Sequence, residues 1–190
     1  MKENTRQRLI DTTYEEIYSN GYQGSSLAEI LKKAEVHKGS MYHYFKNKKD
    51  MALVSIEEKL NAKFFERYAG VLDEKSNYID SLFDKFKDTS TRDFKRGCPV
   101  ANIVQEMSNI DEDFNKTMKD IYSNLREYFI KILDKAIEVK EIKECDTSKI
   151  ALYMSSVLEG AILAAKASGD EKDYLHSIEV LEDYISTFKI

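Results

Sequence analysis

The sequence predicts an all-α fold of about nine helices. Glycine occurs 7 times and proline once in 190 residues, whereas average usage would give roughly 13 and 10. This shortage of turn-forming residues disfavours the many tight reversals of a β-sandwich or barrel. Apolar residues instead recur at helical spacing, and no segment alternates as a strand does. With 42% hydrophobic and 33% charged residues, the chain can form a core and stay soluble, so intrinsic disorder is disfavoured.

The first helix is expected over residues 4–20, because Ile10, Tyr14 and Ile17 share one helical face. Gly21 follows at the position where a helix C-terminus favours a residue that adopts a positive φ. The first helix should therefore end just before Gly21.

A short second helix is expected over residues 27–34. Ser26 and Glu29 have the spacing of a capping box, in which each side chain bonds a backbone N–H at the helix start. Residues 35–37 interrupt the apolar pattern, and residues 38–44 can form two further turns. The spacing thus predicts two short helices joined by a three-residue turn.

The rest of the chain is expected to form six more helices. One over residues 48–72 would span roughly 35 Å at about 1.5 Å per residue. Pro99 suits a first helical turn, and Asp111 and Asp146 suit N-caps. The other apolar stripes lie at residues 79–86, 100–107, 114–136, 150–165 and 171–188, with a loop at 89–97.

The net charge of −5 hides an uneven distribution. Residues 1–50 carry nine basic and seven acidic residues, a net charge of +2, and the remaining residues carry 20 and 27, a net charge of −7. Because phosphate contacts need Lys and Arg, the acidic total alone would argue against nucleic acid. The basic residues between positions 32 and 49 remove that objection.

Several other classes are disfavoured. No apolar run approaches the roughly 18 residues of a membrane span, and no leader-like segment follows Met1, so we expect a cytoplasmic protein. No nucleophile elbow, P-loop or glycine-rich nucleotide motif occurs. We therefore expect no enzyme activity and no cofactor.

The cysteines and histidines do not form a metal-site pattern. Cys98 and Cys145 are far apart, and none of His37, His43 and His176 lies three residues after a glutamate. We expect no metal site. Cys98 precedes a helix start next to a basic residue, which can lower a thiol pKa, so a redox switch at Cys98 is kept as a hypothesis.

The two short helices have the dimensions of a helix-turn-helix. The second of them, which starts at residue 38, is short, and its first turns carry small and hydrogen-bonding side chains, as entry into the major groove requires. Tyr44 and Phe45 are expected to pack beneath it. The predicted DNA-binding residues are Ser25, Ser26, His37, Lys38, Gly39, Ser40, Tyr42, His43, Lys46 and Lys48.

Residues 9–51, LIDTTYEEIYSNGYQGSSLAEILKKAEVHKGSMYHYFKNKKDM, resemble the TetR family of bacterial transcriptional repressors. Two positions depart from the family pattern. Glu35 stands where the family commonly has glycine, so we expect a turn that tolerates a side chain. His37 stands where the family often has a serine or threonine cap, so its imidazole is expected to cap the helix or contact phosphate.

The resemblance implies an N-terminal helix-turn-helix DNA-binding domain, residues 1–47, and a helical ligand-binding and dimerisation domain, residues 48–190. It places ligand-binding residues on apolar stripes that suggest an apolar or aromatic effector, with no inward cluster of charges. These residues are Phe83, Phe86, Met107, Phe114, Met118, Tyr122 and Tyr153. The implied dimer interface uses the last two helices, at Gly160, Ala161, Ala164, Ile178, Leu181 and Ile185.

The predicted function is a ligand-responsive repressor that binds a palindromic double-stranded DNA operator as a homodimer and is released by a small effector. An activator of the same fold, and a helical protein-interaction module without specific DNA binding, remain as alternatives. The sequence does not identify the operator, the effector or the regulated genes.

Overall fold

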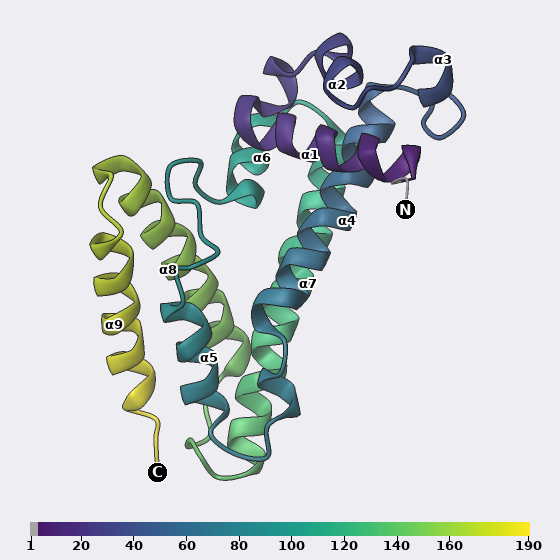
Figure 1. Ribbon diagram of the computed structural model, residues 1–190. Coiled ribbons are helices and arrows are strands. Elements are labelled where there is room, and N and C mark those ends of the chain that lie inside the picture. The colour runs from purple at the N-terminus through teal and green to yellow at the C-terminus, as the bar shows by residue number, and fades with distance from the viewer. Residues whose placement is uncertain (1–3) are drawn as a thin grey trace. The chain divides into compact units, whose positions relative to one another are not determined.

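The computed structural model describes residues 4–190 and confirms the all-α prediction (Figure 1). Within these residues no strand is found, and one isolated antiparallel bridge joins Ile142 and Lys189. In order, the helices of the described chain are α1 (Thr5–Gly24), α2 (Leu27–Lys33), α3 (Lys38–Met41), α4 (Lys48–Tyr68), the 3-10 helix η1 (Val71–Asp73), α5 (Tyr78–Lys87), α6 (Pro99–Met107), α7 (Glu112–Glu138), α8 (Thr147–Ser168) and α9 (Lys172–Ser186).

Several expected helix ends are confirmed. Gly21 has φ 76° and interrupts α1, which resumes for one more turn after it. Proline 99 begins α6, and the carboxylates of Asp111 and Asp146 accept backbone N–H groups in the first turns of α7 and α8. The prediction for α4 is four residues too long, because Gly70 adopts φ 88° just after the helix ends.

The chain divides into two compact units. The first unit comprises residues 1–63 with 99–121, and the second comprises residues 64–98 with 122–190. Helices α4 and α7 each begin in the first unit and end in the second. The boundary expected at residue 47 does not coincide with the limits of these compact units, and as a boundary between functions it stays a prediction.

The first unit has two apolar clusters. In one, α1, α2 and α3 bury Leu9, Ile10, Ile30 and Met41 against the start of α4. In the other, the middle of α4 packs against α1, α6 and the first half of α7. Its buried members are Tyr14, Ile17, Ala52, Ile56, Leu60, Ile103, Met107, Phe114, Met118 and Ile121. The short helices α2 and α3 are therefore held by a continuous framework of longer ones.

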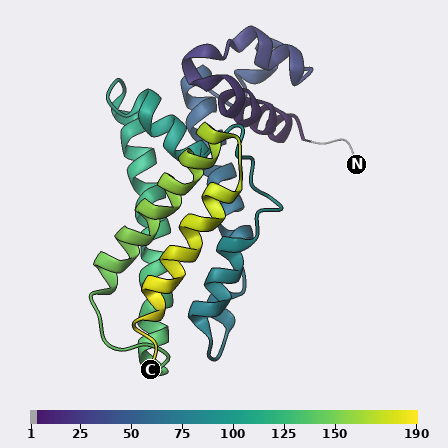
Figure 2. The same cartoon turned by 90° about the vertical axis from the view of Figure 1, so that its left-hand side faces the viewer.

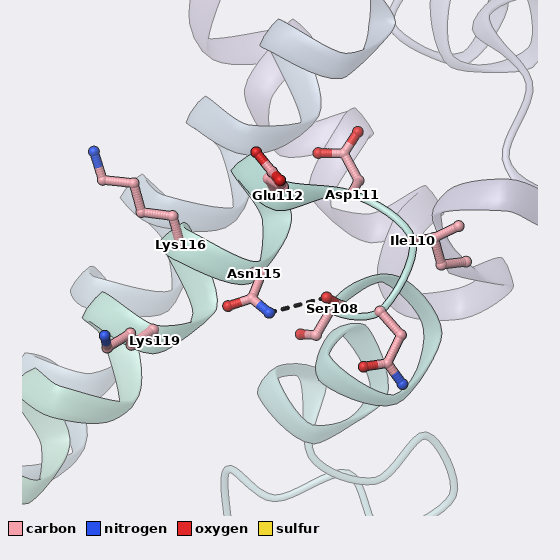
Figure 3. Close-up of a pocket in the computed structure, with 8 residues that line it drawn as sticks. Ser108, Ile110, Asp111, Glu112, Asn115, Lys116 and Lys119 are labelled. Carbon is pink, nitrogen blue, oxygen red and sulfur yellow. Dashed lines mark hydrogen bonds between the residues drawn. The ribbon is translucent and has the colours of Figure 1, made fainter.

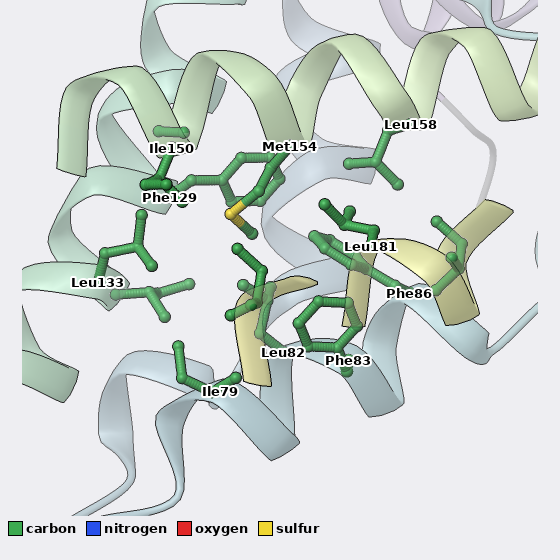
Figure 4. Close-up of a cluster of buried hydrophobic side chains, with 14 of the residues drawn as sticks. Ile79, Leu82, Phe83, Phe86, Phe129, Leu133, Ile150, Met154, Leu158 and Leu181 are labelled. Carbon is green, nitrogen blue, oxygen red and sulfur yellow. The ribbon is translucent and has the colours of Figure 1, made fainter. Parts of the chain in front are cut away.

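The second unit has one larger apolar cluster, built by α5, α8, α9 and the C-terminal parts of α4 and α7. Phe83, Phe86, Phe129, Met154 and Leu181 meet inside it (Figure 4). Helices α8 and α9 lie side by side along their lengths (Figures 1 and 2). Burial of these side chains is what fixes the packing of the unit.

Helix α8 corrects one expectation from the sequence. Its 22 residues include an 18-residue window of mean hydropathy 1.4. Among the described residues, α8 is the one helix that is long and apolar enough to cross a membrane, by length and composition only. Such a helix also occurs in the core of soluble proteins. Here Ile150, Met154, Leu158 and Ala165 bury one side of α8 in the second unit.

The turn between α2 and α3 also differs from expectation. Glu35 was expected to indicate a turn compatible with a side chain, yet it adopts φ 54°, in the left-handed region. The N–H of Val36 donates to the carbonyl of Leu31 at 3.0 Å, which closes α2 over this residue. A Cβ in this conformation crowds the neighbouring carbonyl. The turn thus keeps the geometry that favours glycine, with a glutamate in it.

Glu35→Gly should therefore raise the free energy of unfolding by about 1 kcal/mol, because glycine removes the Cβ crowding. Urea unfolding of the full chain at fixed protein concentration measures this gain. Glu35→Ala is the matched control, since it removes the charge and keeps the Cβ. Equal stability of the glycine and alanine variants would contradict the presence of backbone strain at residue 35.

Candidate nucleic-acid interface

The helix-turn-helix is built by local capping and by the cluster beneath it. Ser26 Oγ accepts the N–H of Glu29 at 3.1 Å, which confirms the serine half of the predicted capping box. Helix α3 is shorter than predicted, because regular helix ends at Met41 and residues 42–44 form turns. His37 occupies the N-cap position but its imidazole makes no capping hydrogen bond, so the expected histidine cap is wrong.

Eight of the ten predicted DNA-binding residues are exposed or half-buried and make no internal contact that excludes DNA, and we call this set the reading face. It comprises Ser26 before α2 and seven residues on and around α3. Tyr42 is 52% exposed, and the Lys38 ammonium lies 6.0 Å from the centre of its ring. The α3 part of the reading face consists of His37, Lys38, Gly39, Ser40, Tyr42, His43 and Lys46.

Gly39 has no neighbour that requires a glycine. A Cβ added there meets no atom within 4 Å, and its φ is not in the left-handed region. Glycine lowers helix stability relative to alanine. A glycine at this exposed position therefore weakens α3 without relieving any contact inside the chain.

Tyr44 and Phe45 differ from each other. Phe45 is buried beneath α3, as predicted, whereas Tyr44 is exposed, so the packing predicted for Tyr44 is wrong. Tyr44 lies 6.5 Å from Phe45 between ring centres. Its exposed ring is a surface feature beside the reading face.

Two predicted DNA-binding residues have internal partners instead. Ser25 is 4% exposed, and its hydroxyl donates to the carbonyl of Gly21 at 2.6 Å. The Lys48 ammonium donates to the carbonyl of Tyr22 at 2.5 Å and lies 4.1 Å from the centre of the Tyr22 ring. Burial lowers the pKa of Lys48. Both side chains hold the corner between α1 and α2 rather than project from the reading face.

Glu106 on α6 completes this corner, and the sequence analysis missed it. Its carboxylate accepts the backbone N–H groups of Tyr22 at 2.9 Å and Gln23 at 2.8 Å. A Cβ on Gly21 would lie 2.8 Å from both carboxylate oxygens. Gly21 is thus needed for its positive φ and for this close approach. Because 85 residues separate Gly21 from Glu106, only the missing side chain of Gly21 hints at the contact in the sequence.

Further contacts fix the same corner to α7. The rings of Tyr22 and Phe114 have centres 4.6 Å apart, and the Lys49 ammonium pairs with Asp111 at 2.7 Å and Asp113 at 2.6 Å. Both carboxylates raise the pKa of Lys49. Within the first unit, the corner before α2 is therefore bound to α6, to α7 and to the start of α4, and Lys49 joins the start of α4 to the start of α7.

A polar hollow of about 500 Å³ lies where α6 meets α7 (Figure 3). Asn115 spans one side of it and donates from Nδ2 to the carbonyl of Ser108 at 3.0 Å. Lys116 and Lys119 line the α7 side, and Asp111 and Glu112 line its end. None of the seven predicted ligand-binding residues lines this hollow.

Those seven residues are divided between the two units. Met107, Phe114 and Met118 belong to a core of the first unit. In the second, Phe83 and Phe86 are buried with ring centres 5.4 Å apart. Tyr122 lies beside the carboxyl of Glu159 on α8, whose charge adds to burial in raising the pKa of Tyr122. Tyr153 is exposed and packs on Tyr184 with ring centres 5.4 Å apart. A shared ligand site for these residues stays a prediction.

The predicted dimer residues also lie on different sides of their helices. Ala161, Ile178, Leu181 and Ile185 are buried in the core of their own chain, so they offer no surface to a second copy. Gly160 is exposed and Ala164 is half-buried. The apolar residues on the outward faces of α8 and α9 are Leu152, Tyr153, Leu163, Val180 and Tyr184.

The expectation that no inward cluster of charges exists is wrong. In the second unit, buried atoms of Arg92 and Glu159 lack hydrogen-bond partners within the described chain. Cys98 Sγ donates to Glu159 Oε1 at 3.2 Å, and Arg96 pairs with Asp93 at 2.6 Å. Burial raises the pKa of Glu159. In the described part of the chain, no group of three or more His, Cys, Asp or Glu residues is arranged to hold a metal ion.

The geometry defines a helix-turn-helix protein with a separate helical unit. Residues 9–54 match the family model described as bacterial regulatory proteins, tetR family. Residues 77–181 match the model described as the C-terminal domain of tetracyclin repressor-like proteins. The chain belongs to the TetR family of transcriptional regulators.

Relatives and solved structures extend over almost the whole chain. Transcriptional regulator AcuR of Cereibacter sphaeroides is 31% identical over 90% of this chain and 80% of its own. The repressor NemR of Escherichia coli is 26% identical over 96% of this chain and 94% of its own. A TetR family regulator from Cytophaga hutchinsonii has a TM-score of 0.87 at 25% identity, covering 98% of this chain and 95% of its own.

The reduced form of Escherichia coli NemR has a TM-score of 0.86 at 24% identity, covering 95% of this chain and 96% of its own. These relatives are named as transcriptional regulators. This chain is therefore a DNA-binding transcriptional regulator of the TetR family.

Glu106→Ala should lower the free energy of unfolding by about 1–2 kcal/mol, because two backbone N–H groups lose a charged acceptor. Gly21→Ala should also destabilise, since its Cβ would meet the carboxylate and alanine disfavours a positive φ. In urea unfolding the two losses should not add, because the clash needs the carboxylate. Gly24→Ala is the matched control, with its nearest contact an ordinary 3.7 Å. Strictly additive losses would contradict the Gly21–Glu106 contact.

Proposed function

We propose that this regulator is a repressor that binds a palindromic operator as a homodimer and is released by a small effector. The reading face is the observation that carries the DNA-binding part. It combines a lysine, a serine and two long side chains on a short helix with a glycine that the chain itself does not require. A backbone without a side chain can approach a sugar-phosphate strand closely, and lysines add attraction for phosphate.

The exposure and internal partners of the predicted DNA-binding residues revise the proposed DNA contacts. Ser26, His37, Lys38, Gly39, Ser40, Tyr42, His43 and Lys46 are proposed to contact the operator. Ser25 and Lys48 are proposed to act indirectly, because their polar groups hold the corner that positions α2. In a dimer, two reading faces about 34–36 Å apart would meet two half-sites one duplex turn apart.

The outward faces of α8 and α9 are proposed as the dimer interface. Val180 is 66% exposed and Leu163 is 58% exposed, and both belong to helices that lie side by side. Exposed apolar residues gathered on adjacent helices indicate a protein contact. Gly160 and Ala164 fit this interface because small residues allow helices to approach closely, whereas the four buried residues support it from within.

The effector is proposed to act by shifting a conformational equilibrium. Helices α4 and α7 each run from the first unit into the second. Glu106 ties α6 to the corner before α2, and Asp111 ties the start of α7 to the start of α4. A ligand that binds one conformation more tightly changes its population by that difference in binding free energy. Release from DNA would follow if the favoured conformation places the reading faces at an unsuitable spacing.

We also propose that the protein acts in the cytoplasm and has no enzymatic role. Its relatives are named as regulators. Deletion of the gene distinguishes repression from the alternative of activation, because loss of a repressor raises output from the target promoter. Selection of bound sites from random DNA, followed by a screen for molecules that release them, identifies the operator and the effector class.

Gly39→Ala should separate stability from DNA binding. Alanine should raise the free energy of unfolding by up to about 1 kcal/mol, since it favours the helix and meets no neighbour. Affinity for the selected operator should fall about tenfold or more if the backbone approaches DNA there, equivalent to about 1.4 kcal/mol. Unfolding and fluorescence anisotropy measure the two effects, and unchanged affinity would argue against close backbone approach.

Tyr42→Ala and Lys46→Ala should weaken operator binding without loss of stability, because both side chains are exposed. Lys46→Ala should also reduce the slope of log affinity against log salt by about one charge. Lys131→Ala on α7 is the control, an exposed lysine in the second unit. Binding that is independent of salt and of DNA sequence would favour a protein-interaction module.

Val180→Asp and Leu163→Asp should convert the dimer to monomers, because each buries a charge in an apolar contact. Analytical ultracentrifugation measures the state, and Lys131→Asp serves as the matched control. Dimers that persist in both variants at low protein concentration would place the interface elsewhere.

A further inference from the structure

A polar cluster lies within the second unit, which we call the arginine cluster. It comprises Arg67 and Tyr68 at the end of α4, Arg92 in the segment between α5 and α6, Glu159 on α8 and Tyr174 on α9. The guanidinium carbon of Arg92 lies 4.6 Å from the centre of the Tyr174 ring. Tyr68 and Tyr174 are buried members of the apolar core. Two cationic side chains therefore stand at the edge of an aromatic interior.

Arg92 is the incompletely bonded cation of the cluster. Its Nε and Nη2 atoms are buried and have no acceptor in the chain over residues 4–190. The hydroxyls of Tyr68 and Tyr174 are its hydrogen-bonding neighbours, and the Tyr174 hydroxyl in turn donates to the carbonyl of Phe86 at 2.7 Å. Contact with the Tyr174 ring compensates part of the charge. It provides no acceptor for the two N–H groups, and buried donors of this kind are normally satisfied.

Arg67 adds a second positive charge. Its Nη2 donates to the carbonyl of Thr91 at 3.2 Å, which places it beside the segment that carries Arg92. Burial lowers the pKa of Arg67, and the charge of Arg92 lowers it further. Two guanidinium groups that repel each other are thus kept together, and the carboxylate of the exposed residue Asp88 lies close enough to interact with both.

Glu159 is the buried acid near the pair, and Asp88 is the exposed one. Glu159 Oε1 accepts from Cys98, and the buried Oε2 of the same carboxylate has no donor within the described chain. Burial raises the pKa of Glu159, although the Arg92 charge opposes this effect. Asp88 and Glu159 thus both lie near the two guanidinium groups, but neither carboxylate bonds Nε or Nη2 of Arg92.

We infer that Arg92 and Arg67 form a binding site for the carboxylate of a small organic acid with an apolar or aromatic remainder. A guanidinium presents its donors in a planar fork that matches a carboxylate. The aromatic side chains beside the arginines give an apolar environment for the remainder of the acid, and Phe94 packs in a tilted arrangement on Tyr174 with ring centres 5.1 Å apart. A monocarboxylate fits better than a dianion, because the carboxylate of Asp88 already interacts with both guanidinium groups.

This site deepens the proposed function, because the bound acid would be the effector. Only that role as effector rests on the proposed function. The sequence predicts an apolar or aromatic effector. From the arginine cluster we add that this effector carries a negatively charged head group. The dimer and the reading face are not needed for the carboxylate to bind.

The test compares carboxylates with their neutral amides. Acetate, butyrate and benzoate, each paired with its amide at equal concentration and ionic strength, are added to the full wild-type chain. Thermal unfolding and calorimetric titration measure binding. At least one carboxylate should raise Tm and bind about tenfold or more tightly than its amide, the loss expected when a charged hydrogen-bonding partner is removed.

Arg92→Gln should remove this preference for the carboxylate, and Arg67→Gln should weaken it. Arg96→Gln is the matched control, because Arg96 lies in the same segment and already pairs with Asp93. The Tm of each variant is first measured without ligand, so that a misfolded variant is recognised. The use of two separate substitutions keeps the test valid if one of them does not fold. The inference is overturned if no carboxylate binds better than its amide, or if both Arg92→Gln and Arg67→Gln bind as the wild type does.

Titrations without DNA keep this result separate from the proposed function. If carboxylates bind but do not release the selected operator, the site stands and its role as the effector site fails. If no carboxylate binds while operator binding and release by other molecules are found, only the carboxylate site fails.

Discussion

The two hydrogen bonds from the N–H groups of Tyr22 and Gln23 to the Glu106 carboxylate are the interaction on which the reading unit depends. The chain must turn sharply between α1 and α2, and a turn leaves backbone donors without helical partners. A single carboxylate from α6 satisfies two of them, in a space left by the missing side chain of Gly21. The direction of α2 is therefore set by a residue more than 80 positions later in the chain.

That constraint explains why the compact units do not follow the order of the sequence. Helix α6 and the first half of α7 belong with the helix-turn-helix, because Glu106, Asp111 and Phe114 all contact the corner or the start of α4. In a repressor of the proposed kind, a change in α6 would reach the reading face through bonds to backbone groups. Substitution of surface side chains on α2 or α3 would leave that connection intact.

The sequence predicted elements whose signals are local. Ser26, Pro99 and Asp146 mark helix starts within one turn, and periodic apolar residues predicted the order of the helices. The outward and inward sides of α9 were not predictable, because Ile178 and Val180 are both apolar and only tertiary packing decides which is buried. Nor was the arginine cluster, since Arg67, Arg92 and Glu159 come from separate segments. The contacts of Ser25 and Lys48 were likewise invisible, because polar residues near a reading helix suit either DNA or the corner that supports it.

The apolar outer side of α8 and α9 has a consequence for the newly made chain. Leu152, Leu163 and Val180 face solvent in a single copy, and α8 is apolar enough to resemble a membrane span. In the proposed dimer this side is covered only when two copies meet, and assembly by mass action is slow when copies are scarce. For that dimer, a cell that makes few molecules of the protein would leave this side uncovered for longest, so chaperone capacity and synthesis rate would bear on how much active regulator accumulates.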